Sequence, residues 1–239
     1  MPCYPRVLAA GDAAVTVEFG ETIAPEINDR VMAFAQAVEG LGLDGLIETV
    51  PTYRSATVYF DPVVIEADQL AKRLLALAGS LPPTTVRPSR KVDISVAYGG
   101  EFGPDLDDVA SFARLSVEET IALHVSVEYR VYMLGFSPGF PYLGLVPDAI
   151  AMPRLATPRA KVRAGSVGIA GSQTGVYPFD TPGGWRIIGR TPLRLYDQAR
   201  PKPFLLEPGD SVRFVCIDRQ EFERLAAEIE SLTDLWSHQ

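Results

Sequence analysis

Residues 81–90, LPPTTVRPSR, hold three prolines in ten positions and show no apolar periodicity. Proline has a fixed φ and lacks a backbone N–H, so a cluster of prolines interrupts both helices and central strands. We therefore expect a semi-rigid, proline-rich linker over residues 84–90. It would divide the chain of 239 residues into an N-terminal domain, 1–83, and a C-terminal domain, 91–239.

The N-terminal part has the pattern of a small α+β unit. AVTVEF at 14–19 and SATVYFDP from Ser55 alternate apolar and polar residues, as half-buried strands do. Each is followed by a helical pattern, the first with Pro25 near its start and the second with Leu70, Leu74 and Leu77 on one face. Helices that cover one face of a short sheet can close a core, so we expect an α/β sandwich.

The C-terminal part has the pattern of a closed β structure. Ser116 with Glu119 three residues later is a capping box that starts a helix. From 137 to 209 the chain is dense in Gly and Pro, with the short β-type runs SVGIAG, TGVYPF and GWRIIGR. Many short strands joined by turns favour a barrel, because closure removes exposed edges. We expect Cys216, within the strand pattern SVRFVCI, to be buried.

Composition and charge exclude several classes of partner. The net charge of −8 disfavours attraction to nucleic acid or to anionic lipid. No apolar run approaches the roughly 18 residues of a membrane span, and the N-terminal sequence lacks a basic region followed by an apolar core. Two cysteines cannot form a metal cluster by themselves. We therefore expect a cytoplasmic protein without a nucleic-acid partner, a membrane partner or a metal site.

The charge is unevenly distributed along the chain. Residues 151–200 hold eight basic residues, seven of them arginines, against two aspartates. A cationic segment in an acidic protein favours a local anionic ligand or an acidic patch on another subunit, and arginine favours planar bidentate recognition. Alternatively, several of these arginines pair with acids elsewhere in the chain.

The turn GFSPG at 135–139 fits the G-x-S-x-G pattern of a serine nucleophile, with Ser137 at its centre. Pro138 follows the serine and has no N–H to supply an oxyanion hole. The chain holds only two histidines, His124 and His238, as candidate bases. We therefore interpret the segment as a rigid turn whose aromatic residues build a pocket wall.

Three segments carry a resemblance to a known family: YMLGFSPGFPYLG, TPRAKVRAGSVGIAGSQTGVYPFDTPGGWRIIGRTP and PFLLEPGDSVRF. Together they closely resemble the family of 5-oxoprolinase B subunits, also called KipI-like or allophanate hydrolase subunit 1. Segments nearer the N-terminus, such as GDAAVTVEFG and ETVPTYRSATVYFDP, also fit the family and occur in the expected order, so the resemblance covers nearly the full length. Arg163 stands where we would expect a proline in the family.

The resemblance implies an α+β fold, with a small N-terminal α/β sandwich followed by a cyclophilin-like β-barrel. A cyclophilin-like fold does not by itself imply isomerase activity. The resemblance also implies an enzyme subunit that pairs with a C-type subunit and acts with an A-type subunit to open 5-oxoproline to L-glutamate at the expense of ATP. The chain alone would be inactive, and ATP, with magnesium as a candidate companion, would bind together with the partner subunit.

Two alternatives remain open at this point. Some members of the family are described as inhibitors that bind a sensor histidine kinase. Others are subunits or parts of carboxyltransferase-type enzymes that process allophanate or urea amides.

We expect His124 and Arg190 to be the catalytic residues, the first as a proton-transfer group and the second as an anion-binding group. His124 shares a helix face with Val117 and Ile121, which is also the pattern of a core histidine. The remaining residues expected to line a substrate or nucleotide pocket are Ser137, Phe140, Arg159, Lys161, Ser166, Gln173, Tyr177, Gly183, Gly184 and Trp185.

Overall fold

The computed structural model describes residues 3–81 and 90–236, with side chains described as far as residue 231. The chain divides into two compact units, Met1–Pro88 and Ser89–Gln239. Of the expected linker, 84–90, all but Arg90 lies outside the described residues.

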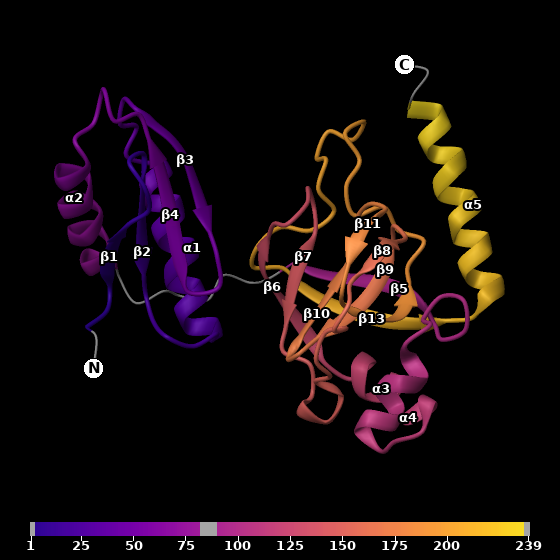
Figure 1. Cartoon of the computed structure of the whole chain (residues 1–239). Coiled ribbons are helices and arrows are strands. Elements are labelled where there is room, and N and C mark those ends of the chain that lie inside the picture. The colour runs from indigo at the N-terminus through magenta and orange to yellow at the C-terminus, as the bar shows by residue number, and fades with distance from the viewer. Residues whose placement is uncertain (1–2, 82–89, 237–239) are drawn as a thin grey trace. The chain divides into compact units, whose positions relative to one another are not determined.

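The N-terminal unit is a four-stranded antiparallel sheet with two helices (Figure 1). The strands lie in the order β1-β2-β4-β3, with β2 and β4 in the centre. The elements in chain order are β1 (Arg6–Ala9), β2 (Ala14–Glu18), α1 (Pro25–Glu39), β3 (Leu46–Pro51), β4 (Ser55–Phe60) and α2 (Ala67–Ser80).

Both helices pack on the same face of this sheet. Val31 and Phe34 of α1 and Leu74 of α2 share one buried cluster with Val17 of β2 and Val58 of β4. Pro25 lies in the first turn of α1, where backbone N–H groups have no acceptor within the helix, so the missing N–H of proline costs no hydrogen bond. The expected α/β sandwich is therefore present.

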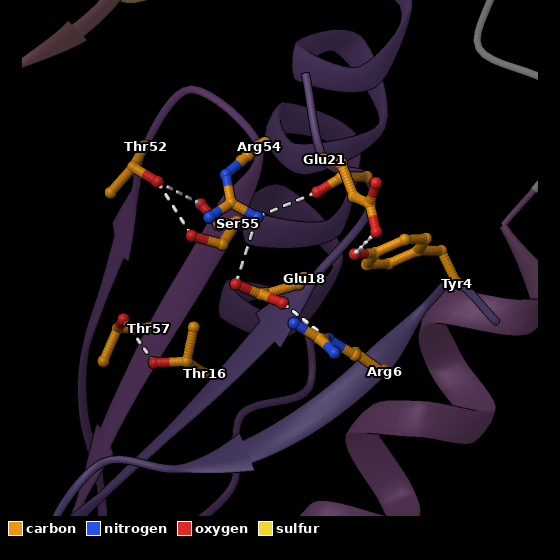
Figure 2. A network of polar contacts seen from close by, with 10 residues as sticks. Tyr4, Arg6, Thr16, Glu18, Glu21, Thr52, Arg54, Ser55 and Thr57 are labelled. Carbon is orange, nitrogen blue, oxygen red and sulfur yellow. Dashed lines mark hydrogen bonds and ion pairs between the residues drawn. The ribbon is translucent and has the colours of Figure 1, made fainter. Parts of the chain in front are cut away.

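The opposite face of the sheet carries polar side chains (Figure 2). The hydroxyls of Thr16 and Thr57 lie 2.8 Å apart across β2 and β4. The carboxylate of Glu18 accepts hydrogen bonds from Arg6 Nε at 2.6 Å and Arg54 Nη1 at 3.2 Å. Arg54 also donates to the carbonyl of Gly20 at 2.9 Å, so Glu18 and Arg54 together join β1, the end of β2 and the turn between β3 and β4.

The C-terminal unit is built on a closed barrel with the strand order β10-β7-β6-β13-β5-β12-β9. Strands β5 and β13 are parallel, and the other paired strands of the barrel are antiparallel. Its elements are β5 (Lys91–Tyr98), α3 (Leu106–Ala113), α4 (Val117–Val125), β6 (Glu128–Leu134), β7 (Pro141–Gly144), the short helix η1 (Asp148–Ile150), β8 (Arg159–Val162), β9 (Ser166–Ala170), β10 (Gln173–Val176), β11 (Thr181–Gly183), β12 (Arg186–Arg190), β13 (Ser211–Ile217) and α5 (Arg219–Trp236).

The barrel has an interior core and an additional layer outside its wall. Val131, Val167 and Phe214 belong to the interior cluster, which Leu106 and Val109 of α3 extend. Helices α3 and α4 lie together at one end of the barrel, and the turn between β6 and β7 lies at the other (Figure 1). Strands β8 and β11 form a separate two-stranded ribbon. The predicted α+β fold class with a β-barrel is confirmed.

Local predictions in this unit have mixed outcomes. The capping box of α4 is confirmed, since Glu119 N–H donates to Ser116 Oγ at 3.1 Å and Ser116 N–H donates to the Glu119 carboxylate at 2.8 Å. The expected burial of Cys216 is wrong, because its side chain is exposed. Strand β6 pairs with β13 only along Ser211–Arg213, so the C-terminal part of β13 lacks that neighbour. In the described residues, no helix has both the length and the apolar character needed to cross a membrane.

We predict that Glu18→Gln lowers the free energy of unfolding of the N-terminal unit by about 1–2 kcal/mol, because a nearly buried charge-assisted contact is weakened. Glu21→Gln is the matched control, since Glu21 accepts an exposed bond from Tyr4 and exposed bonds contribute little. Urea titration of both variants measures the difference. Equal effects at the two positions would contradict the structural importance of Glu18.

Candidate functional site

The turn between β6 and β7 is closed by its own backbone. Ser137 N–H donates to the carbonyl of Gly135 at 2.7 Å, and Phe140 N–H donates to the carbonyl of Ser137 at 3.0 Å. Gly135 N–H donates back to the carbonyl of Phe140 at 3.1 Å. Gly139 has a φ of 78°, which glycine adopts without strain. The segment is therefore a preorganised turn.

Ser137 has no base beside it in the described part of the chain. Its hydroxyl oxygen is buried and has no hydrogen-bond partner. The two ring nitrogens of His124 are bonded to Tyr98 and Thr174 instead. A buried hydroxyl without a partner has lost its hydration without compensation, so this oxygen is available to a ligand group that reaches it.

His124 lies inside the barrel and has no exposed surface. Its Nδ1 is 2.8 Å from the hydroxyl of Tyr98, and its Nε2 is 3.1 Å from Oγ1 of Thr174. Thr174 donates its single hydroxyl proton to the carbonyl of Gly168 at 3.0 Å. The network therefore assigns Nε2 as the protonated nitrogen and Nδ1 as an acceptor from Tyr98.

The surroundings of His124 keep its ring neutral. The imidazole stacks on Phe214 with ring centroids 4.6 Å apart. Burial lowers the pKa of His124 from its ordinary 6.5 to about 3. These are the contacts of a core histidine, so direct contact with a substrate would require the barrel interior to open.

Strand alternation separates His124 from the other predicted site residues. Thr174 points into the barrel toward His124, and the next residue, Gly175, faces outward. A Cβ on Gly175 would meet the rings of Trp185 at 3.0 Å and Phe140 at 3.1 Å. The barrel wall therefore stands between the histidine and these aromatic residues.

Several predicted pocket residues meet in the layer outside the wall. The ring of Phe140 lies 5.1 Å from Tyr177 and 5.3 Å from Trp185, each edge to face. Gly183 lies against Tyr177, whose hydroxyl would be 2.4 Å from a Cβ at that position. Gly184 accepts a hydrogen bond from Leu155 N–H at 2.8 Å. Phe140, Tyr177 and Trp185 are nearly fully buried, so they form a packed support.

Part of the cationic segment is neutralised by acids from the start of α3. Arg159 donates to the buried carboxylate of Asp105 at 2.6 Å, and the other oxygen of Asp105 accepts from Ile187 N–H at 2.6 Å. Arg186 pairs with Asp108 at 3.1 Å. Asp105 was not predicted from the sequence, because nothing local to an aspartate before a helix reveals a partner more than fifty positions away.

Lys161 is paired within the segment itself. Its ammonium group lies 2.7 Å from the carboxylate of Asp180. The same carboxylate accepts a hydrogen bond from Ala164 N–H at 2.8 Å. These contacts, with those of Arg159 and Arg186, agree with the alternative that several of the basic side chains pair with acids of the chain.

Three arginines of the segment, Arg154, Arg163 and Arg190, have no ion pair with any described residue. Arg190 donates from Nε to the carbonyl of Ala164 at 2.8 Å and lies over the ring of Phe222. Burial, and then the nearby charge of Arg163, lower the pKa of Arg190. The charges of Asp180 and Glu101 oppose this shift but form no ion pair with Arg190. Two neighbouring guanidinium groups without a directly paired carboxylate suit a phosphate or a carboxylate ligand.

Of the remaining predicted residues, one lies beside this pair and one does not. Ser166, nearly buried on β9, is the direct cross-strand neighbour of Arg190. Gln173 lies at the start of β10, opposite Ala170 and Gly144, and is not grouped with Arg190 by any described contact. Within the described residues, no three His, Cys, Asp or Glu side chains form a group that could hold a metal ion.

Two hollows in the described part of the C-terminal unit lie away from the predicted site residues. One of about 450 Å³ is lined by residues of α4 together with Leu115 before it and Ser126 after it, and one of about 340 Å³ is lined by residues of β5, β6 and β13. Neither is lined by a predicted site residue. The candidate site therefore has two parts that no described contact joins directly: the turn with Ser137 and its aromatic support, and the pair of Arg163 and Arg190.

Comparison with known proteins identifies relatives along almost the whole chain. A family model described as "Carboxyltransferase domain, subdomain C and D" matches residues 5–206. The 5-oxoprolinase B subunit of Bacillus subtilis is 43% identical over 91% of this chain and 95% of its own length. The protein of the same name from Escherichia coli O157:H7 is 43% identical over 88% of this chain and 95% of its own length.

Some of the solved structures that are similar to this chain belong to longer proteins. The crystal structure of TTHA0988 matches 86% of this chain with 41% identity and a TM-score of 0.76, but this match spans 40% of TTHA0988. The urea amidolyase of K. lactis matches 93% of this chain with 22% identity and a TM-score of 0.80, over 15% of its length. That second match concerns the fold alone.

We predict that His124→Gln flattens the acid dependence of stability. Because the folded pKa lies below the unfolded one, the unfolded chain takes up the proton first as the pH falls, so the native protein loses about 1.4 kcal/mol per pH unit from pH 6.5 downward. Above pH 6.5 this contribution is fully present. The glutamine can accept from Tyr98 and donate to Thr174 but does not titrate.

Urea unfolding of both proteins between pH 7 and pH 5 measures this difference before most carboxylates titrate. Parallel slopes in the two proteins would contradict the neutral, buried state of His124.

Proposed function

Because the chain belongs to the carboxyltransferase domain, subdomain C and D, family, and within it to the 5-oxoprolinase B subunits, we propose that it is the B subunit of a 5-oxoprolinase complex. The observation that carries the proposal is the 43% identity to the Bacillus subtilis protein along 95% of that protein. The reaction proposed is the ATP-dependent opening of 5-oxoproline to L-glutamate, in the cytoplasm.

The proposal includes two further subunits. The name of the relatives, a B subunit, implies companion subunits, and we propose that a C-type subunit pairs directly with this chain and that an A-type subunit completes the complex. The match to only 40% of TTHA0988 supports such pairing, because there a related region is joined to further polypeptide.

The chemistry calls for stabilisation of anionic charge. A five-membered lactam resists hydrolysis, and ATP supplies the phosphoryl group that makes its carbonyl carbon a better electrophile. Arg163 and Arg190 are suited to hold a phosphate or carboxylate, since neither forms an ion pair with a described acid, although the charges of Asp180 and Glu101 act on Arg190. The chain has no phosphate-loop motif, so we propose that the nucleotide binds together with the C-type subunit.

Among the described residues no group of three His, Cys, Asp or Glu side chains could hold a magnesium ion by itself, so we propose that magnesium would be held through the ATP phosphates together with the partner subunit. Ser137 fits the role of a positioning group, because its buried hydroxyl has no partner of its own. It can give one hydrogen bond to a bound amide without acting as a nucleophile.

A second function is favoured by one observation. The urea amidolyase of Lachancea kluyveri is 24% identical over 93% of this chain, although the match covers 14% of that protein. A role in processing a urea derivative therefore remains the alternative, and substrate choice in one assay separates the two.

We predict that the purified chain alone neither hydrolyses ATP nor opens 5-oxoproline. With C-type and A-type subunits added, ATP hydrolysis should depend on 5-oxoproline, measured by coupled release of ADP. Replacing 5-oxoproline by urea tests the alternative. Turnover by the single chain would contradict the shared site, and urea-dependent turnover would favour the second function.

We predict that Arg190→Lys in the assembled complex lowers turnover at least a hundredfold, equivalent to about 2.7 kcal/mol, because lysine keeps the charge but loses the planar fork. Arg213→Lys is the matched control, since Arg213 is exposed on β13 and pairs with Asp93. Melting temperature and subunit binding are measured on the same preparations. Equal turnover of the two variants would show that Arg190 is not part of the site.

A further inference from the structure

The side chain of Phe136 is exposed although it is a large aromatic group. It is 64% exposed, and its φ of 66° is a left-handed conformation that bulky residues rarely adopt. The hydrogen bonds of the turn hold this conformation, and the ring contacts Phe140 edge to face at 5.5 Å. The turn therefore presents a rigid aromatic side chain to solvent.

Further aromatic residues gather beside this turn. Tyr196 lies 5.6 Å from Phe179 and 5.2 Å from Phe204, measured between ring centroids. Phe179 is 38% exposed and Phe204 is 40% exposed. Gly139 connects the turn to this group, because a Cβ there would lie 3.1 Å from Cβ of Tyr196. We call Phe136, Phe179, Tyr196 and Phe204 the aromatic patch.

The segment that carries Tyr196 and Phe204 is also held in place. The two residues form an antiparallel bridge, and Leu205 N–H donates to the carbonyl of Leu195 at 2.8 Å. This segment and the β6–β7 turn rise at the same end of the barrel, away from α3 and α4 (Figure 1). A preordered surface loses little conformational entropy when it binds.

The edge of the aromatic patch is positively charged. Arg194 and Arg200 both approach Asp197, at 3.9 and 3.8 Å, which leaves one excess positive charge among the three. Exposed aromatic rings bordered by arginines are typical of the centre and rim of protein interfaces. A partner with apolar side chains and an acidic border fits this chemistry.

We propose that the aromatic patch is the surface on which the C-type subunit docks, with Phe136 as its central anchor. This inference rests on the proposed function for the identity of the partner. The related region of TTHA0988 is joined to additional chain, so a separate subunit is expected to cover an exposed face of this one. Docking beside Phe136 would also enclose the neighbouring Ser137.

The test measures binding of the full chain to the purified C-type subunit by calorimetry. Phe136→Ala should weaken the complex at least thirtyfold, as truncation of a central aromatic residue does at protein interfaces, and Phe136→Tyr should restore most of the affinity. Phe112→Ala is the control, because Phe112 is 49% exposed on α3, at the other end of the barrel. It should change the affinity less than twofold, and all variants should keep the wild-type melting temperature within a few degrees.

Other outcomes would overturn the inference. If Phe136→Ala binds like wild type, the aromatic patch is not the docking surface, even when the complex is active. If sedimentation shows that the chain alone dimerises and that only dimerisation is lost in Phe136→Ala, the occupant is a second copy of the chain. If Phe136→Ala loses binding but the wild-type complex shows no 5-oxoproline-dependent ATP hydrolysis, the docking surface stands and the proposed function is refuted.

Discussion

The parallel pairing of β5 with β13 is the constraint on which the C-terminal unit depends. It joins the first strand of this unit to its last, from Ser211 opposite Lys91 to Ile217 opposite Ala97. Without this pairing both strands would be sheet edges with unpaired backbone groups, and the sheet would have no enclosed side. Closure gives every strand an inward and an outward face, and this distinction decides what each candidate residue can do.

On the inward face the only polar groups that can persist are those with complete hydrogen bonding. His124 meets this condition through Tyr98 and Thr174, and Thr174 meets it through the carbonyl of Gly168. Such a network is a property of the core. On the outward face, Gly175 has no side chain and lets Phe140 and Trp185 pack directly on the wall. The residues free to meet a ligand lie beyond that layer.

The sequence predicted the architecture better than the site. Periodicity, the capping box at Ser116 and the Gly/Pro-rich strands are local signals, and the corresponding elements form as expected. The burial of Cys216 was predicted wrongly, because it depends on where β6 ends beside β13. The pairing of Arg159 with Asp105 depends on the closed barrel and has no local signal. The side of the wall on which His124 lies likewise follows from closure.

Some arginines of the cationic segment form ion pairs with aspartates and others do not, and this difference indicates which of them can bind a ligand. Asp105 and Asp108 neutralise Arg159 and Arg186, next to the start of α3, where the contacts fix β12 against the helix. Arg190 is partly desolvated, which raises the cost of keeping its charge, and it forms no ion pair with a described residue, although the charges of Asp180 and Glu101 act on it. A structural arginine in that position would gain from a carboxylate partner. Since no described acid contacts Arg190 directly, its guanidinium group is able to bind an anion that arrives with the substrate or with the partner subunit, which is why the shared site and the docking surface must be tested in the assembled complex.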